Sequence, residues 1–141
     1  MVASRRDRSR RAARRVPFLE PRPRILVVCE GEVTEPQYLE GFRRWCKNPR
    51  VEVHIEGRGG VPFTLVKKAR DIRAAAEAEA AAEKDENLRY EQVWCVFDFD
   101  QHPRLAEARR MAKDNGLRLA MSNACFELWL LLHLRDNPGA Q

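Results

Sequence analysis

Apolar and polar positions alternate in blocks along the chain, and this pattern predicts four strands separated by helices. Short, largely apolar runs, typical of buried strands, occur at 25–29 (ILVVC), 51–55 (VEVHI), 92–97 (QVWCVF) and 117–121 (LRLAM). Segments with helical spacing lie between and after them, at 35–46, from Pro62 onwards, from Pro103 to Gly116, and at 124–134. This order predicts an α/β fold, a sandwich whose central, mostly parallel four-stranded sheet has helices on both faces.

Acidic residues directly follow the first and third predicted strands. Glu30 comes after the first strand, and Asp98 and Asp100 come after the third. In parallel α/β sheets, ligands bind beyond the carboxyl ends of the strands, so we expect these three side chains at one edge. Hard cations such as magnesium prefer carboxylate oxygens, and an extended Asp-x-Asp segment places both side chains on one side. The competing interpretation is that Asp100 caps a helix or forms an Asx turn.

Glu127 lies within the apolar segment CFELWLLLHL, which predicts a last helix over 124–134 with Asn123 as its cap. A helix that is apolar all round is usually buried, and a buried carboxylate is costly unless it is paired or binds a metal. Exposure near the helix start, where the helix dipole favours negative charge, is the alternative. Both interpretations stay open at this point.

Histidine, glycine and cysteine positions give weaker signals. His102, beside the acidic pair, is a candidate for proton transfer or substrate contact, whereas His54 in a strand and His133 favour structural roles. The glycine-rich segment 57–60 before a helix could cradle a phosphate, but a plain turn is the favoured interpretation. The four cysteines lack CxxC spacing, which favours small buried hydrophobic residues over a zinc site. They are Cys29, Cys46, Cys95 and Cys125.

Positive charge is concentrated at the N-terminus. Nine arginines against Asp7 and Glu20 give residues 1–24 a charge of +7, so the remainder carries −2 of the total of +5. Residues 1–23 are therefore predicted to be a disordered basic tail, either a phosphate-attracting arm or a plain solvated segment. Residues 24–141 are predicted to form one folded domain. We expect a cytoplasmic protein without a membrane partner, because no secretory signal or membrane-spanning run is visible.

Three segments together resemble the RloB-like family of the Toprim superfamily, which includes primases, topoisomerases and OLD-type nucleases. They read ILVVCEGEVTEPQYLEGF, VWCVFDFDQH and SNACFELWLLLH, and the resemblance runs from about Arg24 to the C-terminus. It implies a Toprim-like sandwich in which Glu30 is a general acid/base. It also implies that Asp98 and Asp100, together with Glu30, hold magnesium or manganese, and that Glu127 belongs to the site through its FELW motif.

The resemblance also implies a function. It predicts a metal-dependent nuclease that cuts RNA, transfer RNA included, or DNA, in prokaryotic antiviral or abortive-infection defence, beside a partner ATPase. RNA is favoured over DNA only through the family, since the sequence reveals no aromatic stacking platform on a predicted sheet face. It further implies a C-terminal extension that would hold substrate contacts.

Two other functions stay open. One is a phosphotransferase with Asp98 as nucleophile and Asp100 as acid/base. Such enzymes need a lysine and further acids downstream of the pair, and Lys113 and the few acids that follow Asp100 meet this need poorly. The other is a non-catalytic Toprim domain that binds a nucleotide or a partner ATPase.

Overall fold

The computed structural model of the chain describes residues 22–99 and 101–134. The strands are β1 (Arg24–Cys29), β2 (Glu52–Glu56), β3 (Gln92–Asp98) and β4 (Arg118–Ser122). The helices are α1 (Thr34–Cys46), α2 (Pro62–Glu83), α3 (Leu105–Asp114) and α4 (Phe126–Leu132), with the short 3₁₀ helix η1 (Glu86–Leu88) before β3. The predicted alternation of strands and helices is confirmed.

The four strands form one parallel sheet in the order β2-β1-β3-β4. On β1, Leu26 pairs with His54 of β2 on one side and with Val93 of β3 on the other. The chain thus leaves β1 toward β2 and then crosses back to β3, which makes the carboxyl ends of β1 and β3 the topological switch point of the sheet. The segments that follow these two strands are therefore placed side by side.

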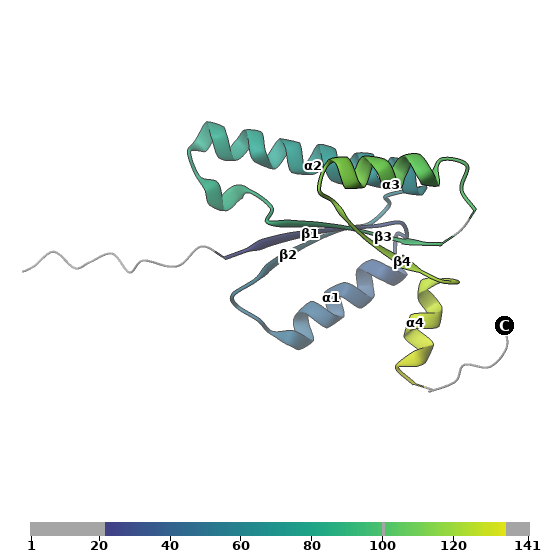
Figure 1. The fold of residues 1–141 in the computed structure, drawn as a ribbon. Helices are drawn as coiled ribbons and strands as arrows, with labels where there is room; N and C mark the ends of the chain where they lie inside the picture. Colours follow the sequence, from purple (N-terminus) through teal and green to yellow (C-terminus); the bar gives the residue numbers. More distant parts are fainter. Residues whose placement is uncertain (1–21, 100, 135–141) are drawn as a thin grey trace, which may run out of the picture.

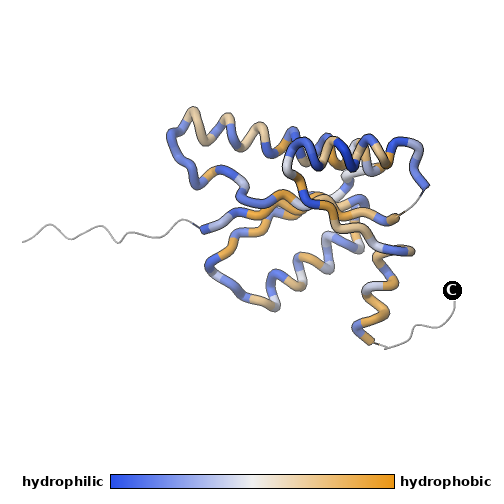
Figure 2. The backbone as a smooth tube through the Cα atoms, in the orientation of Figure 1, coloured by the Kyte–Doolittle hydropathy of each residue, from blue (hydrophilic) through white to orange (hydrophobic). Residues whose placement is uncertain are grey.

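Helices cover both faces of the sheet, as predicted. Figure 1 shows α2 and α3 on one face and α1 and α4 on the other. Successive strand side chains point to opposite faces. On β1, Leu26 and Val28 therefore pack in the core under α2 and α3, whereas Val27 and Cys29 pack in the core of the other face. Figure 2 shows the resulting hydrophobic strands between the helical layers.

The long helix α2 follows its sequence signals closely. Pro62 occupies the first helical turn, where its missing N–H costs no hydrogen bond. Leu65 and Ala69 are fully buried against the sheet, Ala76 is buried, and Ile72 packs against the same core. The predicted apolar face of this helix is confirmed.

Two expectations about α4, on the face opposite α2, are wrong. The last helix is shorter than 124–134, and its N-cap residue is Cys125 instead of Asn123, with no side-chain cap. It is also not buried all round, since Trp129 is 50% exposed and Leu132 is 45% exposed. Phe126 and Leu130 are the residues of this helix that belong to the described core under α1 and α4.

The cysteines divide between the core and the surface. Cys29 and Cys95 are buried, which confirms the expected role as small hydrophobic residues, and burial raises the pKa of each thiol to about 12. Cys46 is exposed at the end of α1, so the expectation of burial is wrong for this position. No helix in the two described ranges is long and apolar enough to cross a membrane.

Candidate acidic site at the switch point

Glu30 and Asp98 meet at the carboxyl ends of β1 and β3. The backbone N–H of Glu30 donates to the Val96 carbonyl of β3 at 2.9 Å, which extends the pairing of the two strands by one residue. The side chain then turns back, and Glu30 Oε2 accepts a hydrogen bond from the Asp98 backbone N–H at 3.0 Å. One carboxylate oxygen of Glu30 is therefore fixed by the strand that carries Asp98.

Asp98 lies among other acidic side chains in the described part of the chain. Its Oδ1 atom is buried and has no hydrogen-bond partner among the described residues. Burial raises the pKa of the Asp98 carboxyl above its usual range, and the nearby charge of Glu30 adds to this effect. The charges of Glu127 and Glu35 act in the same direction, whereas a hydrogen bond from the Phe126 backbone N–H lowers the pKa. The site therefore favours a proton or a cation on Asp98.

Glu35 is a member of this cluster that sequence reasoning missed. It lies in the first turn of α1 and is only 8% exposed, which makes it the one buried charged residue in the described part of the chain. Its carboxylate lies against the backbone of Gly31, where an added Cβ would come within 2.1 Å of Glu35 Oε2. Gly31 thus makes room for a neighbouring carboxylate. A signal was present, because Glu35 follows Glu30 by five residues at a helix start.

His102 stands at the opposite side of Glu30 from Asp98. Its Nε2 atom lies 4.0 Å from Glu30 Oε1, and the two side chains are 24% and 27% exposed. This nitrogen is buried and makes no hydrogen bond with the described residues. In sites without substrate, hydrogen bonds of this kind are often long and shorten when substrate binds.

The remaining predicted site residues are placed less directly. Glu127 is exposed in the first turn of α4, which is the alternative that the helix dipole favours. Its negative charge contributes to the raised pKa of Asp98. Asp100 lies outside the described residues. Within the described ranges, no three His, Cys, Asp or Glu side chains converge tightly enough to hold a metal ion. The metal set Glu30, Asp98 and Asp100 therefore stays a prediction.

The glycine-rich segment 57–60 packs against the end of β1. The Gly59 N–H donates to the Cys29 carbonyl at 2.8 Å, and the Arg58 N–H donates to the Gly31 carbonyl at 3.0 Å. A Cβ at Gly59 would come within 2.7 Å of the Cys29 carbonyl oxygen, so close backbone packing requires glycine here. Because two of its amides serve the fold, the segment favours the plain turn over a phosphate cradle.

The other two histidines make structural contacts. His54 belongs to the edge strand β2, and its Nδ1 atom lies 3.0 Å from the Tyr90 hydroxyl. His133 Nε2 lies 3.0 Å from the Tyr38 hydroxyl, which ties the end of α4 to α1.

Fold and site together define an α/β protein with an acidic cluster at the switch point of a parallel sheet. The profile of the RloB-like protein family matches residues 25–141. The chain therefore belongs to the RloB-like protein family. No curated protein and no solved structure shows significant similarity to it.

Proposed function

We propose that the protein is a metal-dependent nuclease that hydrolyses phosphodiester bonds in RNA, transfer RNA included, or in DNA, within prokaryotic antiviral or abortive-infection defence. The observation that carries this proposal is the Asp98 carboxylate, whose Oδ1 is buried beside other acids and has no hydrogen-bond partner among the described residues. Among the described residues, no Lys or Arg forms an ion pair with Asp98, Glu30 or Glu35. A divalent cation is the ordinary relief for such a cluster.

The donor chemistry of the cluster fits magnesium or manganese. The residues expected to hold the ion are Asp98, Asp100 and Glu30, to which the buried Glu35 is added. All are oxygen donors, as hard cations prefer, and no described cysteine or histidine is needed. When bound, the ion supplies the positive charge that polarises a phosphate and makes water a better nucleophile.

Proton transfer is assigned to Glu30. Its Oε2 is held by the Asp98 N–H, which leaves Oε1 on the side of His102. A carboxylate fixed at one oxygen presents the other in a defined direction, which is what a general base or acid requires. His102 is assigned to positioning that free oxygen, since its Nε2 lies 4.0 Å from it and makes no hydrogen bond with the described residues.

The test is cleavage of total RNA and plasmid DNA side by side, with magnesium or manganese and with EDTA. We expect metal-dependent cleavage of one substrate by the wild-type chain and a loss of at least about 100-fold in Asp98→Ala. The matched control is Asp114→Ala, which removes an exposed aspartate from the end of α3, on the other face of the sheet. Equal cleavage by Asp98→Ala and wild type would refute the proposal.

A second candidate is a non-catalytic domain that binds a nucleotide or a partner ATPase. The observation that favours it is that no three metal-donor side chains are gathered among the described residues. The same assay separates the two functions when the partner ATPase is added. Cleavage that appears only with the partner supports a partner-dependent nuclease, whereas metal binding without cleavage in either case supports the non-catalytic domain.

A further inference from the structure

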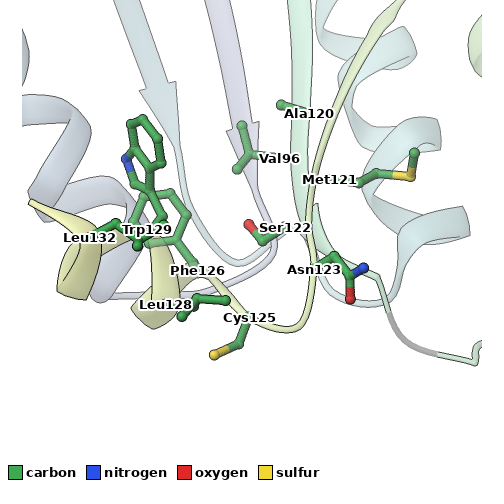
Figure 3. Close-up of a pocket in the computed structure, with 10 residues that line it drawn as sticks. All are labelled: Val96, Ala120, Met121, Ser122, Asn123, Cys125, Phe126, Leu128, Trp129 and Leu132. Atoms are coloured by element: carbon green, nitrogen blue, oxygen red, sulfur yellow. The ribbon is translucent and has the colours of Figure 1, made fainter. Parts of the chain in front are cut away.

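A groove lies beside the acidic cluster, between α4 and the sheet. Its cavity volume is about 410 Å³, within the range of roughly 300–1,000 Å³ typical of small-molecule pockets. Figure 3 shows Val96 of β3 and Ala120 of β4 opposite Phe126 and Trp129 of α4, with Ser122 at the end of β4. The floor is therefore small and apolar, one wall is aromatic, and one end is polar.

The strand register connects this groove to the acidic cluster. Asp98 of β3 is the Cα partner of Ser122, and two residues earlier Val96 is the partner of Ala120. Because side chains two residues apart share a face, the groove floor and Asp98 belong to the same face of the sheet. A ligand in the groove would therefore lie next to the carboxylate that carries the proposed chemistry.

The same face carries a cation at its other end. Arg118, the first residue of β4, is exposed, and its guanidinium carbon lies 5.2 Å from the centre of the Trp94 ring. From Arg118 to Ser122 the strand spans about 13 Å, at roughly 3.3 Å per residue. A strip of sheet thus runs from a positive charge, through an apolar groove with an aromatic wall, to an acidic cluster.

We infer that this groove holds an unstacked base of single-stranded nucleic acid, with Trp129 as the stacking surface and Arg118 as a phosphate contact. The inference rests on the proposed function for the place of the scissile phosphate at Asp98. Aromatic rings bind bases through their faces, and basic residues track the backbone of a single strand. Trp129 is half exposed, with the His133 ring against it at 4.8 Å in a T-shaped arrangement, so part of its ring surface is open to a ligand. The stacking surface was not visible in the sequence because it lies on a helix instead of a sheet face.

The test measures binding without cleavage, so that it is independent of nuclease activity. Binding of a fluorescein-labelled single-stranded RNA 12-mer is followed by anisotropy in EDTA, beside an abasic strand of equal length. The full chain is used, because contacts to phosphate alone should contribute equally to the binding of both strands. We expect Trp129→Ala to weaken binding of the base-containing strand by roughly tenfold, the loss of one base–aromatic stack, and to leave the abasic strand unchanged.

Two further variants define the roles. Trp129→Phe retains an aromatic face, so it should restore most of the affinity and also exclude misfolding as the cause. Arg118→Ala should weaken the binding of both strands alike. It should also reduce the slope of the salt dependence of binding by the amount expected for about one phosphate contact. The matched control is Trp45→Ala near the end of α1, which removes a tryptophan that is 78% exposed and does not line the groove, and it should change the binding of neither strand.

The outcomes separate this inference from the nuclease proposal. Trp129-dependent binding of the base-containing strand without metal-dependent cleavage would support the base groove and refute the nuclease. Cleavage that survives while Trp129→Ala binds both strands like wild type would refute the groove alone. Absence of any base-dependent binding by wild type would also overturn the inference. So would a dimer that Trp129→Ala converts to a monomer without effect on binding, since the groove would then be an interface between two copies.

Discussion

The two faces of the sheet are built differently. Among residues 22–99 and 101–134, the core under α2 and α3 contains eleven buried residues, whereas the core under α1 and α4 contains four. Glu35, the buried charged residue in the described part of the chain, lies on the face under α1 and α4. The side chain of Asp98 points toward the same face. The half-exposed Trp129 and Phe42 lie there too. One face therefore resembles an ordinary protein interior, and the other keeps polar and open positions.

This difference indicates that stability and chemistry are separated across the sheet. Apolar side chains that are closed on all sides contribute most to the free energy of folding. Clustered acids and an open groove cost stability, which is the usual trade-off at functional sites. The closed face can hold β1 and β3 in register while the open face carries like charges at their ends.

The largest expected effect compares two phenylalanines on opposite faces. Phe97 is 1% exposed in the closed core, and Phe126 is 7% exposed beside the groove. We expect Phe97→Ala to lower the free energy of unfolding by about 3–5 kcal/mol and Phe126→Ala by only about 1–3 kcal/mol, because the open side can relax. Urea unfolding followed by circular dichroism measures both. Equal losses would contradict the proposed difference between the faces.

A second prediction concerns the buried acid on the open face. Glu35→Gln keeps the size of the side chain and removes its charge, so we expect cleavage to fall by about 10- to 100-fold, as for residues that support a metal site. The melting temperature in EDTA should not fall, since a buried charge is removed. The control is Glu32→Gln, because Glu32 is exposed in the loop just before α1 and pairs with Arg58 at 3.3 Å. Equal activities of the two variants would exclude Glu35 from the site.

The smallest effect concerns the charge on Asp98. Because the pKa of Asp98 is raised in the folded state, ionisation costs stability as pH rises through the ordinary Asp range to the raised pKa, and the cost persists at neutral pH. Asp98→Asn should therefore have a higher melting temperature than wild type in EDTA at pH 7, which thermal unfolding followed by circular dichroism measures.

The pH dependence and metal dependence sharpen this test. The increase in melting temperature of Asp98→Asn should disappear below the ordinary pKa of aspartate, because the wild-type side chain is then neutral as well. Excess magnesium should raise the melting temperature of wild type more than that of the variant, because a cation that binds the folded state stabilises it. A variant that melts lower than wild type in EDTA would mean that the Asp98 charge is already compensated.

The sequence predicts the sheet well and the open face poorly. Runs such as 25–29 and 92–97 are apolar enough to require burial on both faces, and the helices between them require parallel strands. The place of Glu30 and Asp98 at one edge follows from that topology. Burial of Glu35, in contrast, depends on the space left by Gly31 in three dimensions. Exposure of α4 depends on how little of the sheet lies beneath it, which its own apolar sequence does not reveal.

The sheet order also sets when the acidic cluster can assemble during synthesis. Glu30 and Asp98 are joined by a contact across 68 residues of sequence, and the Asp98 carboxylate also meets the Phe126 backbone N–H. Contacts between distant segments form late, because the intervening chain must be made and closed first. A chain still attached to the ribosome therefore carries Glu30 long before it has an assembled site. If the proposed nuclease function holds, the nascent chain would acquire the site only after β3 and α4 have been made.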